Sequence, residues 1–229
     1  MTRKVLTAFC VLLLIVSFSA FAAASTVVLF NDFGPGNSYN IHNGWIISGP
    51  ASGQCCEIIA MQFTPAVDAN LQQIDLAAGW ISGTDSLTLQ LAVDNNNIPG
   101  AVLESWTLVL LEFLDPNPPI AATSVLNPLL KAGVTYDLVT IAANDEYASW
   151  NWNDQSVDGT ALASFDGGNN WISAPALLGA FDVIGTTAVP TPEPASLLML
   201  GTGLVGAIGY GRRRMFGARS WTGKPSQPR

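Results

Sequence analysis

Apolar and polar residues alternate in short runs along the middle of the chain, between residues 25 and 187. The clearest run covers residues 86–93, where Leu87, Leu89, Leu91 and Val93 fall on one side of the backbone. This two-residue period is typical of a β-strand with one buried face. Comparable runs predict further strands at residues 26–30, 44–48, 57–63, 71–81, 102–110, 134–143, 147–152, 161–165 and 180–184.

Clusters of turn-forming residues separate these runs. Residues 94–100, 115–119 and 166–170 consist almost entirely of Asp, Asn, Pro and Gly, which favour turns. No long helical period occurs between residues 25 and 187, and Pro128 permits at most one helical turn at residues 126–131. Nine or ten short strands joined by turns predict an all-β domain at residues 25–187, either a β-sandwich or a jelly roll.

The first 24 residues have the pattern of a secretory signal peptide. Arg3 and Lys4 precede an apolar run at residues 5–16, and small residues follow up to Ala24. A basic start, a short apolar segment and a small-residue cleavage site direct a chain to export. We therefore predict that the Sec translocon exports the chain and that signal peptidase cleaves between Ala24 and Ser25.

A second apolar segment lies near the C-terminus. Residues 188–194 form a Pro-rich linker, the seventeen residues 195–211 carry no charge, and Arg212, Arg213 and Arg214 follow. A helix of this length extends about 25 Å, enough for a thin hydrocarbon layer. Three arginines stop transfer and hold the following residues in the cytoplasm. The pattern predicts one transmembrane helix at residues 195–211 and a basic cytoplasmic tail at residues 212–229.

The predicted domain is strongly acidic. Residues 25–189 contain sixteen Asp and Glu residues and one base, Lys131, which gives a formal net charge of −15 (1 − 16). The charge of the whole chain is −8, because the terminal segments carry the other basic residues. A domain of this charge repels phosphate backbones, which excludes nucleic acid as a partner. It is compatible with solubility outside the cell and with cation binding.

The C-terminal segment resembles the PEP-CTERM sorting signal of Gram-negative bacteria. Pro192, Glu193 and Pro194 match the motif that names the family, and a Gly-rich apolar span and the arginines follow in the expected order. The resemblance implies processing by an exosortase, a membrane protease or transpeptidase. It also implies an inner-membrane intermediate and a final place at the cell surface or outside the cell. Residues 215–229 continue further beyond the arginines than is usual for such tails.

The domain is similar to the choice-of-anchor R domain, a β-rich exported domain that occurs with various C-terminal anchors. The similar segments are residues 33–39, 44–45, 63–65, 99–106 and 166–171. The resemblance implies the β-rich architecture, and it implies neither a reaction nor functional residues.

Few residues in the domain suit catalysis. The adjacent Cys55 and Cys56 form a vicinal disulfide, bridge to another chain or stay reduced. With the single histidine, His42, they are too few for a structural zinc site. The many acids still offer carboxylate pairs, so a glycan-active, glycoside hydrolase-like enzyme is the alternative prediction. We expect a non-catalytic surface or matrix protein without catalytic residues or a cofactor.

Two kinds of binding remain open. Asp154 and Asp158 lie in oxygen-rich loops suited to a structural Ca²⁺, as do residues 94–97 and 144–146, although none has EF-hand spacing. Asn and Asp residues surround three tryptophans, and aromatic faces beside amide groups bind sugars. These tryptophans are Trp150, Trp152 and Trp171.

Trp150 and Trp152 fall on one face of a predicted strand, so both face the core or both face solvent. Core packing is the default for such residues, and joint exposure would favour glycan contact. We predict an association of the mature protein with extracellular polysaccharide.

Overall fold

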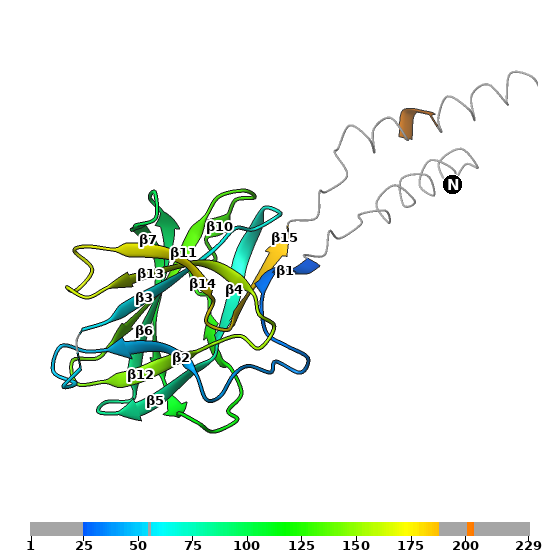
Figure 1. Ribbon diagram of the computed structural model, residues 1–229. Helices are drawn as coiled ribbons and strands as arrows, with labels where there is room; N and C mark the ends of the chain where they lie inside the picture. Colours follow the sequence, from blue (N-terminus) through cyan, green and yellow to red (C-terminus); the bar gives the residue numbers. More distant parts are fainter. Residues whose placement is uncertain (1–24, 55, 188–200, 204–229) are drawn as a thin grey trace, which may run out of the picture. The chain divides into compact units, whose positions relative to one another are not determined.

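The computed structural model describes residues 25–54, 56–187 and 201–203. Within this part of the chain, fifteen strands form three sheets (Figure 1). The predicted all-β class is therefore confirmed. All of these strands belong to one compact unit, residues 24–188.

The largest sheet has six antiparallel strands in the order β14-β13-β3-β11-β6-β7. Its members are β3 (Ile58–Phe63), β6 (Ser86–Asp94), β7 (Pro99–Val109), β11 (Tyr136–Ala142), β13 (Asp158–Ser164) and β14 (Ile172–Leu177). Leu87, Leu89 and Leu91 are fully buried, whereas Thr88 and Gln90 between them are partly exposed. The alternation read from the sequence thus turns one face of this sheet toward the core.

Two smaller sheets contain the remaining strands. The five-stranded sheet consists of β1 (Ser25–Asn31), β15 (Phe181–Thr187), β4 (Ala69–Leu76), β9 (Ile120–Thr123) and β10 (Leu129–Leu130). The four-stranded sheet consists of β2 (Gly44–Ser48), β12 (Tyr147–Asn151), β5 (Ala78–Ser82) and β8 (Leu111–Glu112). The chain passes from β4 to β5 through Ala77, whose N–H donates to Ala180 and whose carbonyl accepts from Asn151. The two sheets are therefore contiguous at this point.

One apolar core joins the three sheets. Trp150 of the four-stranded sheet and Phe181 of the five-stranded sheet are fully buried, with their rings 5.8 Å apart. Phe63 of the six-stranded sheet lies 6.1 Å from the ring of Phe181. Burying such side chains contributes roughly 1.5–3 kcal/mol each. The opposite face of the six-stranded sheet carries a smaller cluster, made of Ile58, Ala60, Val139 and Leu162.

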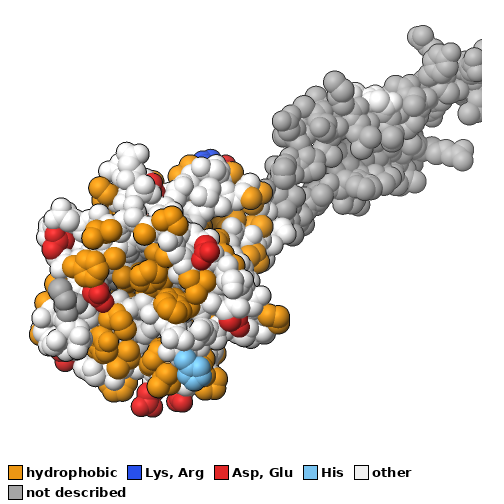
Figure 2. Space-filling view, viewed as in Figure 1, with side chains coloured by type: hydrophobic (Ala, Val, Ile, Leu, Met, Phe, Trp, Pro, Cys, Tyr) orange, Lys and Arg blue, Asp and Glu red, His pale blue; other side chains and the backbone are white. Residues whose placement is uncertain are grey.

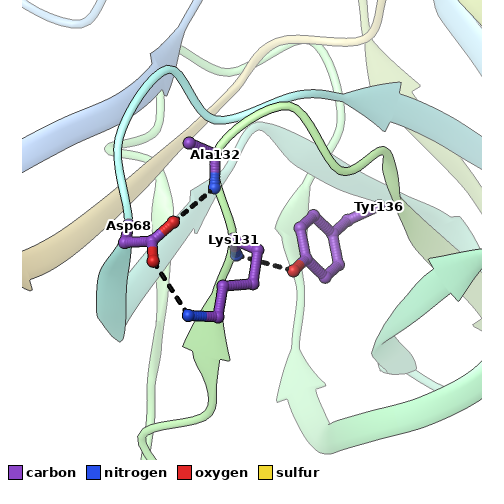
Figure 3. Close-up of polar contacts among 4 residues, drawn as sticks. All are labelled: Asp68, Lys131, Ala132 and Tyr136. Carbon is purple, nitrogen blue, oxygen red and sulfur yellow. Dashed lines mark hydrogen bonds and ion pairs between the residues drawn. The ribbon is translucent and has the colours of Figure 1, made fainter.

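Lys131, the single base of the domain, attaches the loop after β10 to neighbouring strands. Its Nζ lies 2.9 Å from Asp68 Oδ2, while Asp68 Oδ1 accepts the N–H of Ala132 (Figure 3). The hydroxyl of Tyr136 accepts the N–H of Lys131 at 2.8 Å. Both charged side chains are about half exposed, so the ion pair itself stabilises little. The two backbone hydrogen bonds hold this loop in place.

The structure differs from the predicted strands in several places, and the short strands β8, β9 and β10 were not predicted. The predicted strand at residues 71–81 is two strands, because Ala77 turns the chain from one sheet into the next. Residues 126–131 contain no helical turn and lead into β10. Strand β14 was not predicted; it is an edge strand, which is where Pro175 is tolerated in a sheet.

Candidate functional site

Acidic side chains on the face seen in Figure 2 are scattered among apolar and uncharged polar ones, and they form no single patch there. The buried acids are more unusual, because a carboxylate inside a protein needs hydrogen bonds or a charge partner. In the described part of the chain the buried acids are Asp32, Glu104, Asp137, Glu146 and Asp182. These five side chains are therefore candidate functional groups.

Asp75 and Asp182 form a carboxyl pair on the five-stranded sheet. They lie opposite each other on β4 and β15, and the N–H of Asp75 donates to Asp182 Oδ1 at 3.3 Å. Gln73 Nε2 donates to Asp75 Oδ1 at 2.8 Å. Two carboxylates that are close neighbours disfavour each other's ionised form.

Burial is the main cause of the perturbed acidity at this pair. Burial, followed by the charge of Asp75, raises the pKa of Asp182 to about 6. Burial also raises the pKa of Asp75, although the side chain of Gln73 lowers it in part. Perturbed acids are common in active sites, and they occur in structural networks as well.

Asp32 lies beside this pair at the end of β1. Its Oδ1 accepts the N–H of Phe181 at 2.7 Å, and its Oδ2 has no hydrogen-bond partner among the described residues. Burial raises the pKa of Asp32 to about 7, the hydrogen bond from Phe181 opposes the rise, and the charge of Asp182 adds to it. Asp32 and Asp182 therefore exchange protons close to neutral pH.

Glu146 occupies a second buried position, in the oxygen-rich loop at residues 144–146. Its Oε2 accepts the N–H of Ala143 at 2.8 Å, and its Oε1 has no hydrogen-bond partner in the described residues. Burial raises the pKa of Glu146 to about 7, and the charges of Asp85 and Asp145 add to the rise. The carboxylate of Asp145 accepts the hydroxyl of Thr84 at 2.7 Å. Two carboxylate oxygens of this loop therefore already accept hydrogen bonds from neighbouring residues of the protein.

Asp137 is the third buried position and the second residue of β11. Its side chain is 0% exposed, and both carboxylate oxygens lack a hydrogen-bond partner among the described residues. Burial raises the pKa of Asp137 to about 7; the nearby Gln62 side chain lowers it and the charge of Asp94 raises it. The sequence contained a signal for Asp137 and Asp182, since each interrupts an apolar strand pattern.

The three tryptophans predicted as glycan contacts are not exposed together. Trp150 is fully buried, and its Nε1 donates to a backbone carbonyl at 3.1 Å, so it is a core residue and presents no face to a sugar. Trp152 is partly buried, and its Nε1 is enclosed without a partner in the described residues. Trp171 packs on the smaller apolar cluster. The indole N–H also donates to a backbone carbonyl in Trp45, Trp80, Trp106 and Trp171.

The predicted calcium ligands Asp154 and Asp158 are engaged differently. Asp154 accepts the hydroxyl of Ser38 and the side-chain amide of Gln155, each at 2.7 Å, whereas Asp158 is an exposed first residue of β13. Within residues 25–54, 56–187 and 201–203, no three His, Cys, Asp or Glu side chains form a group that could hold a metal ion. A Ca²⁺ at Asp154 and Asp158 stays a prediction.

The single histidine and Cys56 lie in loops. His42 is exposed in a turn where the side chain of Asn40 accepts the N–H of His42 and of Asn43. Cys56 Sγ lies 3.1 Å from the carbonyl oxygen of Phe165. Cys55 lies outside the described residues, so the disulfide stays a prediction.

Most of the predicted sorting signals also lie outside the described residues, although Ser25, the predicted first mature residue, begins β1. The undescribed ones are Ala24, Pro192, Glu193, Pro194, Arg212, Arg213 and Arg214. The structure describes only residues 201–203 of the predicted membrane span. In the part that is described, no helix has the length and apolar character needed to cross a membrane.

Comparison with known proteins identifies the C-terminal segment. Residues 190–214 match the PEP-CTERM protein-sorting motif, so the match covers the Pro-Glu-Pro residues, the apolar span and the three arginines. The search of curated proteins gave no match. The motif confirms the predicted sorting signal. A chain that carries it is exported, processed at the membrane by an exosortase and placed at the cell surface.

Proposed function

We propose that this chain delivers a non-catalytic β-sandwich domain to the cell surface or extracellular matrix, where it associates with polysaccharide. The observation that carries the proposal is the sorting motif at residues 190–214, which begins three residues after the last strand ends at Thr187. The resemblance to the choice-of-anchor R domain, which pairs one exported domain with different anchors, fits the same role.

The packing of the domain supports a role without catalysis. Most of its described tryptophans donate their indole N–H to a backbone carbonyl, and the side chain of Trp150 is buried in the core. The perturbed acids Asp75 and Asp182 favour the alternative of a glycan-active enzyme, because such acids are common in active sites. Each of the two carboxyl groups accepts a hydrogen bond from a neighbouring group of the sheet, as acids in structural networks do, so we prefer the non-catalytic role.

Intact-mass measurement of the protein from its native host tests the sorting route. We expect a mature chain that begins at Ser25 and ends near Pro192–Pro194, since signal peptidase and exosortase remove the two ends. Added glycan mass is compatible with this result. Replacing residues 192–194 by alanine should leave the tail attached and keep the protein in the membrane fraction.

Pro190→Ala is the matched control, because it changes a proline of the same linker outside the Pro-Glu-Pro motif. This variant should be processed as the parent is. Recovery of peptides from residues 215–229 in the parent protein at the cell surface would contradict the sorting route.

A further inference from the structure

Asp137 lies at the start of β11, a middle strand of the six-stranded sheet, on the face away from the main core. Tyr136 and Leu138 on either side of it belong to the main core, so strand alternation turns Asp137 to the opposite face. The side chain is completely buried, and neither carboxylate oxygen has a hydrogen-bond partner within the described residues. Buried polar atoms in folded proteins are nearly always satisfied. A proton or a cation can satisfy this carboxylate.

Gln62 and Asp94 surround Asp137 on the same face. Gln62 lies opposite Asp137 on β3, and Ala92 lies opposite it on β6, with Asp94 two residues further along that strand. Gln62 Nε2 donates to Asp94 Oδ1 at 2.8 Å. Because β3 and β6 lie on either side of β11, this hydrogen bond passes over Asp137. Two carboxylates and one amide therefore enclose a single point on the sheet.

The position of Asp94 is fixed by the turn that follows β6. Its Oδ1 also accepts the N–H of Asn97 at 2.9 Å, and its own N–H donates to Thr135 at 3.1 Å. Asp94 is partly exposed, so this side of the enclosure is open to solvent.

We propose that Asp94, Asp137 and Gln62 form a binding site for a divalent cation, with Ca²⁺ as the occupant. Ca²⁺ takes six to eight oxygen ligands and accepts carboxylates, amide oxygens and water in flexible geometry. The two carboxylates balance its charge, and Gln62 offers Oε1 when its amide rotates. Water supplies the remaining ligands. The set contains no sulfur or imidazole, which disfavours zinc, and Mg²⁺ demands stricter geometry.

The charge of the domain also favours a cation here. Residues 25–189 carry a formal net charge of −15, and their one base, Lys131, is paired with Asp68. Such a field raises the local concentration of cations at the surface. The site is independent of the sorting route and of polysaccharide binding, so its failure would leave the proposed function standing.

Thermal unfolding of the processed protein in EDTA and in CaCl₂ tests the site. We expect Ca²⁺ at about 5 mM to raise the melting temperature by roughly 3–6 °C, with half-saturation on the order of 10⁻⁴–10⁻³ M, as in extracellular calcium modules. Asp137→Asn has nearly the same shape and should abolish the shift. Asp94→Asn should weaken binding and raise the half-saturation concentration of Ca²⁺ at least about tenfold.

Asp154→Asn is the matched control, because Asp154 is the calcium ligand suggested by the sequence and is already bonded to Ser38 and Gln155. This variant should keep the full shift. Absence of a Ca²⁺ response in the parent would overturn the site, and it would mean that a proton satisfies Asp137. An unchanged response in Asp137→Asn, or a loss of response in Asp154→Asn, would overturn it equally. If Asp137→Asn fails to fold, Asp94→Asn decides the test.

Discussion

Burial of carboxyl groups is the most costly feature of the domain at the scale of single residues. Asp75, Asp137 and Asp182 each interrupt an apolar run, so the sequence placed them within strands. It did not show that their face of the sheet is covered, because covering depends on neighbouring strands that are distant in the chain. The same holds for Trp150 and Trp152, whose shared strand was predicted while their degree of burial was not.

Asp32 gives a pH dependence with a definite sign. Its pKa rises from about 3.8 in the unfolded chain to about 7 in the fold, so protonation favours the folded state. That stabilisation is complete below pH 4 and is lost as the pH rises to 7. Asp32→Asn keeps an acceptor for the N–H of Phe181, and at pH 8 it should raise the free energy of unfolding by on the order of 2 kcal/mol.

Urea denaturation at pH 5, 6.5 and 8 measures this effect. The loss of stability between pH 5 and pH 8 should be smaller in Asp32→Asn than in the parent. Asp115→Asn is the control, since Asp115 is exposed and its substitution should leave the slope unchanged. Parallel curves for the parent and Asp32→Asn would show that the burial of Asp32 carries no such cost.

At the scale of elements, the long alternating strands were predictable and the short ones were not. Strand β6 follows its alternating apolar pattern closely, because one buried face requires a two-residue period, whereas β3 and β11 are longer apolar runs buried at most of their positions. Strands β9 and β10 span only four and two residues and lie on the edge of β4 through a connection at residues 124–128. Their pairing depends on side chains from another sheet, which no local pattern reveals.

Glu104 on β7 is the side chain that fastens this connection. Its carboxylate accepts the hydroxyl of Ser124 at 2.6 Å and the N–H groups of Val125 and Leu126 at 2.6 and 3.1 Å. Glu104→Ala leaves these donors without their acceptor and should reduce the free energy of unfolding by about 2–4 kcal/mol. Glu104→Gln keeps one acceptor oxygen and should cost less.

Guanidinium denaturation compares these variants with Glu112→Ala, which removes an exposed acid from β8 and should change stability by less than about 0.5 kcal/mol. An equally small change in Glu104→Ala would show that the connection after β9 is held by its backbone alone.

At the scale of the whole molecule, the sequence predicted the all-β class and the order of export signal, domain and sorting tail. The division into three sheets was not predictable, because Ala77 turns the chain at a site that reads as one continuous strand. The difference in charge between domain and chain could be obtained from the sequence alone, because it requires only counting charged residues: the formal net charge is −15 for the domain and −8 for the chain. Processing therefore leaves a far more acidic molecule than the precursor, and this limits the polysaccharides it can approach.

Retention of the processed protein on immobilised polysaccharides tests this limit. At about 0.01 M salt the Debye length is about 30 Å, so the acidic domain should be repelled by acidic polysaccharides and retained by amino-sugar polymers of similar length. Raising the salt to about 0.1 M shortens the Debye length to about 10 Å and should narrow the difference in retention between the acidic and the amino-sugar polymers.

Neutral polysaccharide is the control, because retention on it should not depend on salt. EDTA in the buffer prevents bridging by Ca²⁺. Equal retention on acidic polymer at low salt would contradict the charge argument, while no retention on any polymer would end the proposed association. Release of soluble sugar during the experiment would favour the enzyme instead.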